Sequence, residues 1–314
     1  MTLDKSSSPI LLLGAACTDV VGRLESDLEP GTSNPARIRT SFGGVARNVA
    51  ENLARLDQPV KLVSAVGKDL PGDELLAYTE AAGVDVSAVL RTGLFPTSFY
   101  MGVLDQRGHL RFAVDDMRAM SELTPDYIQG YQSLFEEASL VFVDGNLSEA
   151  SLKMAVSLAR KCKIPVCADP ASLILAGRLK PILNKLHLVT PNVAEAVALT
   201  GQAFESSDPQ AALEDARALL NEGVDIALIA LAEFGVVYAS SEISGHIPAI
   251  QTPIIDPTGA GDALTAAVLF GLVNDMDLDD AVRLGVSAAS LTLRHSGTVN
   301  PELTLEKLYE QLVI

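Results

Sequence analysis

Residues 256–269 read Asp256-Pro257-Thr258-Gly259-Ala260-Gly261-Asp262, followed by the largely apolar run Ala263-Leu264-Thr265-Ala266-Ala267-Val268-Leu269. The two glycines let the backbone curl so that its N–H groups converge, and the small side chains let an anion come close. The run that follows predicts a helix, whose first turn adds unsatisfied N–H groups and a favourable dipole. The stretch therefore predicts a site for a phosphoryl group, unless it is only a glycine turn with an aspartate cap.

Asp262 follows directly on the second glycine and opens the helix predicted over 262–272. The positive end of the helix dipole is expected to keep its carboxylate ionised. An ionised carboxylate beside a bound phosphoryl group can accept the proton of an alcohol as the alcohol oxygen attacks phosphorus. The stretch thus combines an anion site with a general base, which is the chemistry of phosphoryl transfer to a hydroxyl group.

Upstream of this stretch, short apolar runs alternate with helical patterns over most of the 314 residues. The runs are dense in Val, Ile, Leu and Ala, as expected for strands that are buried on both faces. This order predicts an α/β fold of three layers, with a mainly parallel sheet between helices. The expected strands are 10–13, 60–66, 140–143, 165–168, 186–189 and 226–231, with a short β region at 236–250. The expected helices are 48–56, 72–82, 149–161, 193–199, 209–221, 262–272, 278–293 and 303–312.

Two segments, near 19–42 and 97–116, interrupt the alternation and predict antiparallel β-ribbons. In the second, apolar stretches flank Asp105-Gln106-Arg107-Gly108-His109, a hairpin loop with Gly108 where the backbone needs a positive φ. Two ribbons inserted into an α/β body predict a small lid over the carboxyl edge of the sheet, within a single domain spanning 1–314. The ribbons would leave one sheet face exposed, and we therefore expect a homodimer formed through them.

A second glycine pair lies in Ser41-Phe42-Gly43-Gly44-Val45-Ala46-Arg47-Asn48. Gly43 and Gly44 can admit a sugar ring against the backbone, and the Asn48 amide can hydrogen-bond its hydroxyls. The alternative is a simple turn with Asn48 as the helix cap. Asp19 follows the first strand, where open α/β sheets bind ligands. Its carboxylate could hold two adjacent hydroxyls, or it could serve only in a turn.

A third candidate is the stretch Pro191-Asn192-Val193-Ala194-Glu195, which follows a predicted strand. Residues three apart share a helix face. Glu195 could therefore hold Mg²⁺ through a water molecule while Asn192 faces a phosphate. The alternative is a capping box, because Asn-x-x-Glu also satisfies the first N–H groups of a helix.

The bulk composition excludes several classes of partner. A formal net charge of −17 repels nucleic-acid phosphates and anionic lipids, so we expect neither partner. No apolar stretch reaches the roughly 18 residues of a membrane span. Residues 10–13 are expected as a buried strand rather than the end of a lipoprotein signal, because no basic segment precedes them. Cys17, Cys162 and Cys167 lack a disulfide or metal-ligand spacing, which indicates reduced thiols in a cytoplasmic protein.

Taken together, these stretches resemble the ribokinase-like (PfkB) carbohydrate kinases over essentially the whole chain. The glycine stretch quoted first matches every restricted position of one signature of that family. A second signature matches at Gly43, Gly44, Asn48 and Ala50 but departs at Asp57, where the family has a small residue. The resemblance implies a ribokinase-like fold and transfer of a phosphoryl group from ATP, with Mg²⁺, to a sugar or nucleoside hydroxyl.

The resemblance also implies a role for each residue on the acceptor side. Asp262 is implied as the catalytic base, beside an anion hole at Gly259, Ala260 and Gly261. The implied contacts to the substrate hydroxyls are Asp19, Gly43, Gly44 and Asn48.

On the cofactor side, the resemblance implies that Asn192 faces phosphate and that Glu195 holds Mg²⁺ through water. The family often binds a monovalent cation such as K⁺, which is implied at Asp256 and Thr258 with backbone from 290–297. The nucleotide loop is implied at Ala230-Leu231-Ala232-Glu233-Phe234-Gly235. There Ala232 replaces a glycine and only Gly235 is retained, so we expect the nucleotide to bind more weakly or through backbone contacts alone.

Further stretches resemble one branch of the family, whose acceptor is a nucleoside. They are residues 33–38, 116–117, 144–148 and 169–172. Kinases of ribose, fructose, adenosine or another nucleoside are the alternatives within the family. A catalytically silent sugar-binding protein of the same fold is another, motivated by the altered nucleotide loop. A nicotinamide-dependent oxidoreductase is disfavoured, because no Gly-x-Gly-x-x-Gly follows the first strand.

Overall fold

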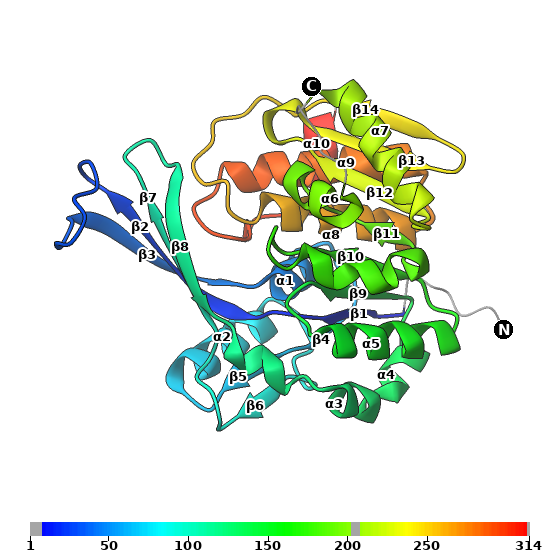
Figure 1. The fold of residues 1–314 in the computed structure, drawn as a ribbon, viewed down its shortest axis with the longest axis horizontal. Helices are drawn as coiled ribbons and strands as arrows, with labels where there is room; N and C mark the ends of the chain where they lie inside the picture. The colour runs from blue at the N-terminus through cyan, green and yellow to red at the C-terminus, as the bar shows by residue number, and fades with distance from the viewer. Residues whose placement is uncertain (1–7, 202–207, 313–314) are drawn as a thin grey trace.

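The computed structural model describes residues 8–201 and 208–312. Its main sheet has eight strands in the order β14-β13-β12-β11-β10-β9-β1-β4 (Figure 1). The strands from β4 to β12 run parallel, and β13 and β14 are added antiparallel at one edge. The predicted mainly parallel sheet is therefore confirmed. The strands of this sheet are β1 (Ile10–Leu13), β4 (Val60–Val63), β9 (Leu140–Asp144), β10 (Val166–Asp169), β11 (Leu188–Val189), β12 (Ile226–Ala230), β13 (Val236–Ser240) and β14 (Ser244–Ile247).

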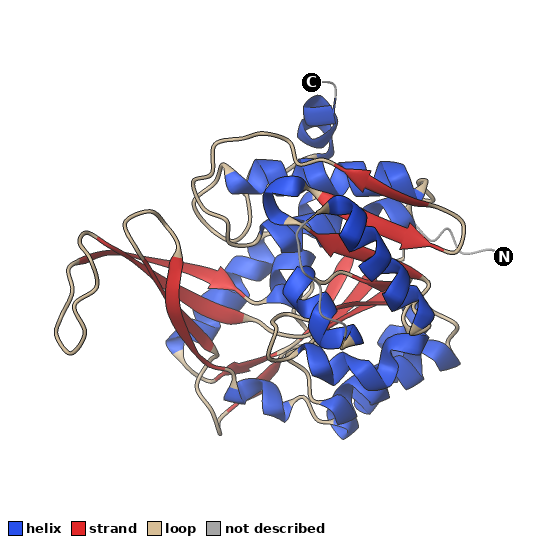
Figure 2. Ribbon diagram, turned by 45° about the horizontal axis from the view of Figure 1, so that its top comes forward, coloured by secondary structure: helices blue, strands red, loops and turns tan. Residues whose placement is uncertain are grey.

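Helices cover both faces of this sheet (Figure 2). Successive residues of β1 alternate between two hydrophobic clusters, with Leu11 and Leu13 in one and Ile10 and Leu12 in the other. Each face is therefore sealed by helices, which is why the strands read as continuous apolar runs. Helices α3 (Pro125–Gly130), α4 (Gln132–Glu137), α5 (Glu149–Lys161), α6 (Val193–Thr200) and α7 (Pro209–Asn221) contribute to the first cluster. Helices α1 (Val45–Arg55), α8 (Ala260–Val273) and α9 (Leu278–Leu293) contribute to the second.

A separate four-stranded sheet, which we call the outer sheet, projects from the body (Figure 1). Its order is β3-β2-β7-β8, and the two predicted ribbons supply its two antiparallel pairs. The parallel pairing of β2 with β7, which joins the ribbons into one sheet, was not predicted. Gly108 in the hairpin loop has the expected positive φ, 89°. The strands are β2 (Cys17–Leu24), β3 (Ala36–Gly43), β7 (Phe99–Leu104) and β8 (Leu110–Asp116).

Several predicted boundaries are wrong. The apolar run 60–66 is two strands, because β5 (Ala65–Gly67) leaves the main sheet and pairs with β6 (Leu90–Thr92). The helix expected from residue 48 begins at Val45, since Gly44 and not Asn48 is its N-cap. Helices α3 and α4 were missed because they are short and mostly polar. The remaining helical segments are α2 (Leu70–Ala81), α10 (Leu305–Leu312) and the 3₁₀ segments Arg118–Glu122, Ala176–Lys185 and Ala232–Phe234.

The strand order also determines where a ligand can bind. After β1, the chain adds β4 on one side of β1 and then adds β9 and the later strands on the other side. The β1–β9 pair is therefore the topological switch point of the sheet. Open α/β sheets bind ligands beyond the carboxyl ends of strands at such a point. Across 8–201 and 208–312, no helix combines the length and apolarity that a membrane span requires. All three cysteines are free thiols.

Candidate active site

The glycine stretch forms a tight loop that leads into α8. Gly259 has a φ of 81°, in the left-handed region that favours glycine. A Cβ atom there would lie only 1.8 Å from the Thr298 carbonyl oxygen, so the loop has no space for a side chain. Gly261 lies in the first turn of α8, where N–H groups have no carbonyl partner within the helix. The loop is therefore made of closely packed backbone at the start of a helix, which is the geometry that the predicted anion site requires.

Asp262 lies in the first turn of α8, and its Oδ2 accepts a 2.7 Å hydrogen bond from the Asn48 side-chain amide. Burial raises the pKa of this carboxyl to about 7, although the Asn48 hydrogen bond and the charge of Arg47 act in the opposite direction. Burial thus opposes the ionisation of Asp262 that the helix dipole was expected to favour. A carboxyl with this pKa can accept a proton and release it again near neutral pH.

Asp19 on β2 is almost completely buried, at 6% exposure, against the glycine pair. A Cβ atom on Gly43 would lie 2.1 Å from the Asp19 carboxylate, and one on Gly44 would lie 2.4 Å from the Ala15 carbonyl oxygen. Because Gly43 and Gly44 have no side chains, the Asp19 carboxylate packs against the backbone of Gly43, and the segment after β1 packs against the backbone of Gly44. Burial raises the pKa of Asp19 to about 6. The Cys17 thiol donates to its Oδ1 over 3.2 Å.

Two side chains flank Asp19 on the same face of the outer sheet. Ser41 lies opposite it on β3, and Tyr100 lies beside it on β7. Burial raises the pKa of Tyr100, and the nearby Asp19 charge raises it further. The Ser41 hydroxyl is buried and has no hydrogen-bond partner among the described residues. A polar ligand at Asp19 would therefore meet an aromatic ring and an unsatisfied hydroxyl group.

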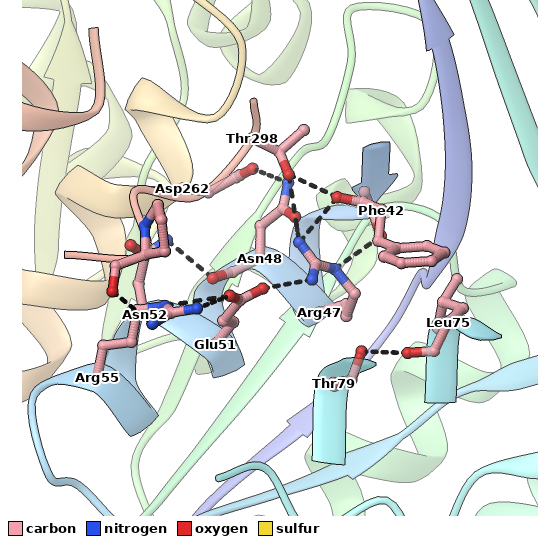
Figure 3. A network of polar contacts seen from close by, with 12 residues as sticks. Phe42, Arg47, Asn48, Glu51, Asn52, Arg55, Leu75, Thr79, Asp262 and Thr298 are labelled. Atoms are coloured by element: carbon pink, nitrogen blue, oxygen red, sulfur yellow. Dashed lines mark hydrogen bonds and ion pairs between the residues drawn. The ribbon is translucent and has the colours of Figure 1, made fainter. Parts of the chain in front are cut away.

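The Arg47 side chain stabilises the end of β3 that leads into the glycine pair (Figure 3). Its guanidinium donates to the Phe42 carbonyl over 2.9 Å and to the Gly43 carbonyl over 3.1 Å. It also donates to the Asn48 side-chain oxygen and is paired with Glu51 one turn along α1. Arg47 has no exposed surface, and the Arg-x-x-x-Glu spacing is the signal that indicates the internal pair with Glu51.

Asp144 is a second residue that the sequence analysis did not assign to the site. It ends β9, and its Oδ2 accepts hydrogen bonds from the backbone of Ala15 at 2.8 Å and Ala46 at 3.0 Å. Burial raises its pKa. The carboxyl joins the end of β9 to the segment after β1 and to the start of α1, across the switch point. Its position at the carboxyl end of a buried strand could have identified it.

Asn192 and Glu195 form the capping box that the sequence left as the alternative. The Glu195 backbone donates to Asn192 Oδ1 over 3.0 Å, and the Asn192 backbone donates to Glu195 Oε2 over 2.9 Å. Asp169, at the end of β10, lies nearby, and its pKa is raised by burial and then by the charges of Glu195 and Asp262. Asp169 was not predicted as a site residue. The negative charges of Glu195 and Asp262 thus act on Asp169, so a positive charge near Asp169 would favour its ionised form.

The donor set fits Mg²⁺ only as part of a complex with its substrate. In the part of the chain that the structure describes, no three His, Cys, Asp or Glu side chains converge closely enough to bind a metal ion. Mg²⁺ keeps several waters and commonly binds through one or two carboxylates plus substrate phosphates. Glu195 and Asp169 are suited to that arrangement, since carboxylate oxygens are hard ligands.

A mainly apolar cavity of about 330 Å³ lies beside the glycine stretch and reaches Ala260 and Gly261. Ala232 and Gly235 also line it. Ala232 has a φ of 51°, in the left-handed region that favours glycine. A Cβ atom on Gly235 would lie 2.1 Å from the Ile247 carbonyl oxygen, so this glycine is required. The cavity has the size and lining of a site for a planar ring, with the phosphoryl site at its end.

The structure thus brings the predicted residues together in two groups. Asp262 is hydrogen-bonded to Asn48, and the charge of Asp19 acts on its pKa, so these residues and the glycine loop lie close together. In the second group, Ala232 and Gly235 line the apolar cavity with Ala260 and Gly261, and the Asn192–Glu195 capping box adjoins Ala230 of the same cavity. Asp256 and Thr258 are bonded to each other, since Asp256 Oδ1 accepts from the Thr258 backbone at 3.0 Å and from its hydroxyl at 2.8 Å. An acceptor hydroxyl, a general base and an anion site can therefore meet at Asp262.

Comparison with known proteins shows which family the chain resembles in sequence and in fold. Residues 8–305 match the family model of the pfkB carbohydrate kinases. The chain is 33% identical to the pseudouridine kinase of Escherichia coli (strain K12) over 297 residues, or 94% of each chain. It is 25% identical to the pseudouridine kinase of Arabidopsis thaliana, over 94% of this chain and 93% of that one. The structure of Arabidopsis thaliana ribokinase complexed with ribose and ATP has the same fold, with a TM-score of 0.86 at 21% identity over 98% of this chain and 99% of that chain.

Proposed function

Because the chain belongs to the pfkB family of carbohydrate kinases, we propose that it transfers the γ-phosphoryl group of ATP to the 5′-hydroxyl of pseudouridine. The family membership makes it an ATP-dependent sugar or nucleoside kinase. The choice of acceptor is carried by the similarity to the Escherichia coli pseudouridine kinase, which extends over 94% of both chains. The stretches 33–38, 116–117, 144–148 and 169–172 carry the resemblance to pseudouridine kinase.

The surroundings of Asp19 support a nucleoside rather than a free sugar. The ribose hydroxyls would bind Asp19, the backbone at Gly43 and Gly44, and Asn48. A base attached to that ribose would reach the face of the outer sheet that carries Tyr100 and Ser41. Aromatic rings stack on bases, and a buried unsatisfied hydroxyl gains most from a polar ligand edge.

In the proposed reaction, Asp262 orients the 5′-hydroxyl and accepts its proton as the oxygen attacks the γ-phosphorus. The Asn48 amide, bonded to Asp262 Oδ2 at 2.7 Å, directs the other carboxylate oxygen toward the acceptor. The backbone amides at Gly259, Ala260 and Gly261 stabilise the charge on the transferring phosphoryl group. The outer sheet acts as a lid that excludes water from this space.

ATP would lie with its base in the apolar cavity beside Ala232 and Gly235 and its phosphates toward Gly261. Mg²⁺ would be held by Glu195 through water and by Asp169, and it would neutralise charge on the β- and γ-phosphates. The side-chain oxygen of Asn192 accepts the capping-box hydrogen bond from the Glu195 backbone, so only its amide nitrogen could face a phosphate.

The test is ADP release from MgATP with pseudouridine, uridine, adenosine, ribose and fructose. Pseudouridine and uridine are matched, because they differ only in the base atom that is joined to the ribose. We expect kcat/KM for pseudouridine to exceed that for uridine by at least about 10²-fold, the scale of discrimination by a buried polar contact. A higher kcat/KM for another acceptor would retain the kinase and overturn pseudouridine. If no acceptor gives ADP release, and calorimetry shows binding of an acceptor but not of MgATP, the result would instead support a binding protein.

We also propose that two chains pair through the exposed face of the outer sheet. This face is apolar, with Ile38 exposed at 72%, Val114 at 59%, Phe112 at 49% and Met101 at 48%, and the strand register places the four side chains on one side. Contiguous exposed apolar patches mark interaction surfaces.

In light scattering at micromolar concentration, the wild type is expected to have the mass of a dimer and Phe112→Lys that of a monomer. The matched control is Ile174→Lys, since Ile174 is 92% exposed outside the outer sheet and should leave the mass unchanged. A monomeric wild type would contradict the proposal.

A further inference from the structure

Asp256 stands immediately before the glycine loop and is almost fully buried, at 4% exposure. Its Oδ1 accepts both the backbone N–H and the hydroxyl of Thr258, at 3.0 and 2.8 Å. These two bonds fix the turn that carries the chain from residue 256 into Gly259. The orientation of the Asp256 carboxylate therefore helps to set the direction of the backbone amides in the anion site.

The other oxygen of Asp256 is engaged from outside the body. Arg39, on β3 of the outer sheet, forms an ion pair with Asp256 Oδ2, and its Nη1 also donates to the Ser296 hydroxyl over 2.9 Å. The guanidinium thus occupies the space between the outer sheet, the segment before α8 and the segment after α9. The charges of both Arg39 and Asp256 act on the pKa of Asp19, so the pair lies close to the acceptor site as well.

These contacts do not fit a monovalent cation at the position that the family resemblance implied. A K⁺ ion would need an oxygen of Asp256 together with neighbouring backbone carbonyls. One Asp256 oxygen is bonded within the turn to Thr258. The other forms an ion pair with the Arg39 guanidinium but accepts no hydrogen bond among the described residues, so the charge of Arg39 is its only compensation there. A cation placed at Oδ2 would have to displace the Arg39 side chain or remain next to its positive charge, which is unfavourable in a partly buried site.

We propose that Arg39 is a built-in replacement for the monovalent cation and a positioning residue for the anion site. Its guanidinium supplies the positive charge that Asp256 requires, and it links the outer sheet to the glycine loop. The kinase is therefore independent of K⁺. The inference rests on the kinase activity of the proposed function, but not on the identity of the acceptor.

The experiment compares the wild type, Arg39→Met and Arg39→Lys in KCl and in choline chloride at equal ionic strength, with the best acceptor of the panel. The wild-type kcat is expected to differ by less than about twofold between the salts. Arg39→Met should lose about ten- to a hundredfold in kcat in choline chloride, the usual effect of removing a partner that orients a site residue. The KM for ATP should change little, because the cavity for the base is intact. KCl should restore part of the lost kcat in Arg39→Met, and Arg39→Lys should retain most of it.

Thermal unfolding of the same proteins without substrates gives a readout that does not depend on catalysis. KCl, relative to choline chloride, should raise the Tm of Arg39→Met and leave that of the wild type unchanged, since a ligand that binds only the folded state stabilises it. A wild type that is activated or stabilised by K⁺ would overturn the proposal. So would an Arg39→Met variant that keeps its kcat in choline chloride. Failure of every protein to phosphorylate any acceptor would count against the proposed function, while the Tm comparison would still test Arg39.

Discussion

Asp262→Asn is expected to lower kcat by about 10²- to 10⁴-fold, the range that general-base catalysis contributes. Asparagine keeps the shape of the side chain but cannot accept the proton of the acceptor hydroxyl. It also still presents an oxygen to the Asn48 amide, so the arrangement at the start of α8 should persist. The KM for the acceptor should change much less than kcat, because the hydroxyl contacts at Asp19 and the glycine pair remain. Steady-state kinetics with MgATP measures both quantities.

The pH dependence of the wild type tests the same assignment. Burial raises the pKa of Asp262 to about 7, and only the ionised form can act as a base. We therefore expect kcat to rise with pH and to reach half its maximum near pH 7. Asp262→Asn should lose this rising limb. A wild-type kcat that is flat between pH 5.5 and 8.5 would exclude Asp262 as the base in the rate-limiting step.

A stability measurement shows whether the variant is folded. The pKa of Asp262 is raised from 3.8 in the unfolded reference to about 7, so the folded chain binds the proton more tightly. This preference stabilises the fold at low pH and is lost as the pH rises through about 7. Asp262→Asn should therefore raise the Tm at pH 8 more than at pH 5. Asp280→Asn is a matched control on the exposed surface of α9, and it should change neither kcat nor Tm. Near-normal turnover in Asp262→Asn would remove the proposed base.

The features that could be predicted from the sequence were mostly local ones. Gly259 and Asp262 are adjacent to the helix that they begin, so their geometry follows from the order of residues alone. The buried strands were equally legible, because a strand covered on both faces has an apolar side chain at nearly every position. The same property hid the break between β4 and β5, since an apolar run does not reveal which sheet each residue joins.

Contacts between distant segments were not predictable in the same way. Asp144 reaches Ala15 and Ala46 only because β9 pairs with β1, and the pairing of strands is a property of the whole sheet. Arg39 meets Asp256 only because β3 of the outer sheet lies next to the segment before α8. The pKa of Asp262 likewise depends on how deeply α8 is buried, which the helix dipole argument could not include.

Glu51→Gln is expected to lower the free energy of unfolding by about 3–5 kcal/mol, the usual loss when one partner of a buried ion pair is removed. Glu51 has no exposed surface and is paired with Arg47 through Oε2 and with Arg55 through Oε1 (Figure 3). A neutral amide leaves the guanidinium of Arg47 buried without a counter-charge. Urea unfolding monitored by circular dichroism gives the difference, provided that the transition remains two-state.

The variant should also affect catalysis, because Arg47 connects the pair to the site. Arg47 contacts the carbonyls of Phe42 and Gly43 and the Asn48 side chain, whose amide donates to Asp262. A displaced guanidinium would loosen both the substrate loop and the base, so we expect a lower kcat and a higher acceptor KM. Glu149→Gln is the matched control, since Glu149 pairs with Lys153 at the same i,i+4 spacing while both side chains are 53% exposed. Exposed pairs contribute at most about 1 kcal/mol. Equal losses of stability in the two variants would show that burial does not make the Arg47–Glu51 pair special, and the positioning role of Arg47 would then have to be abandoned.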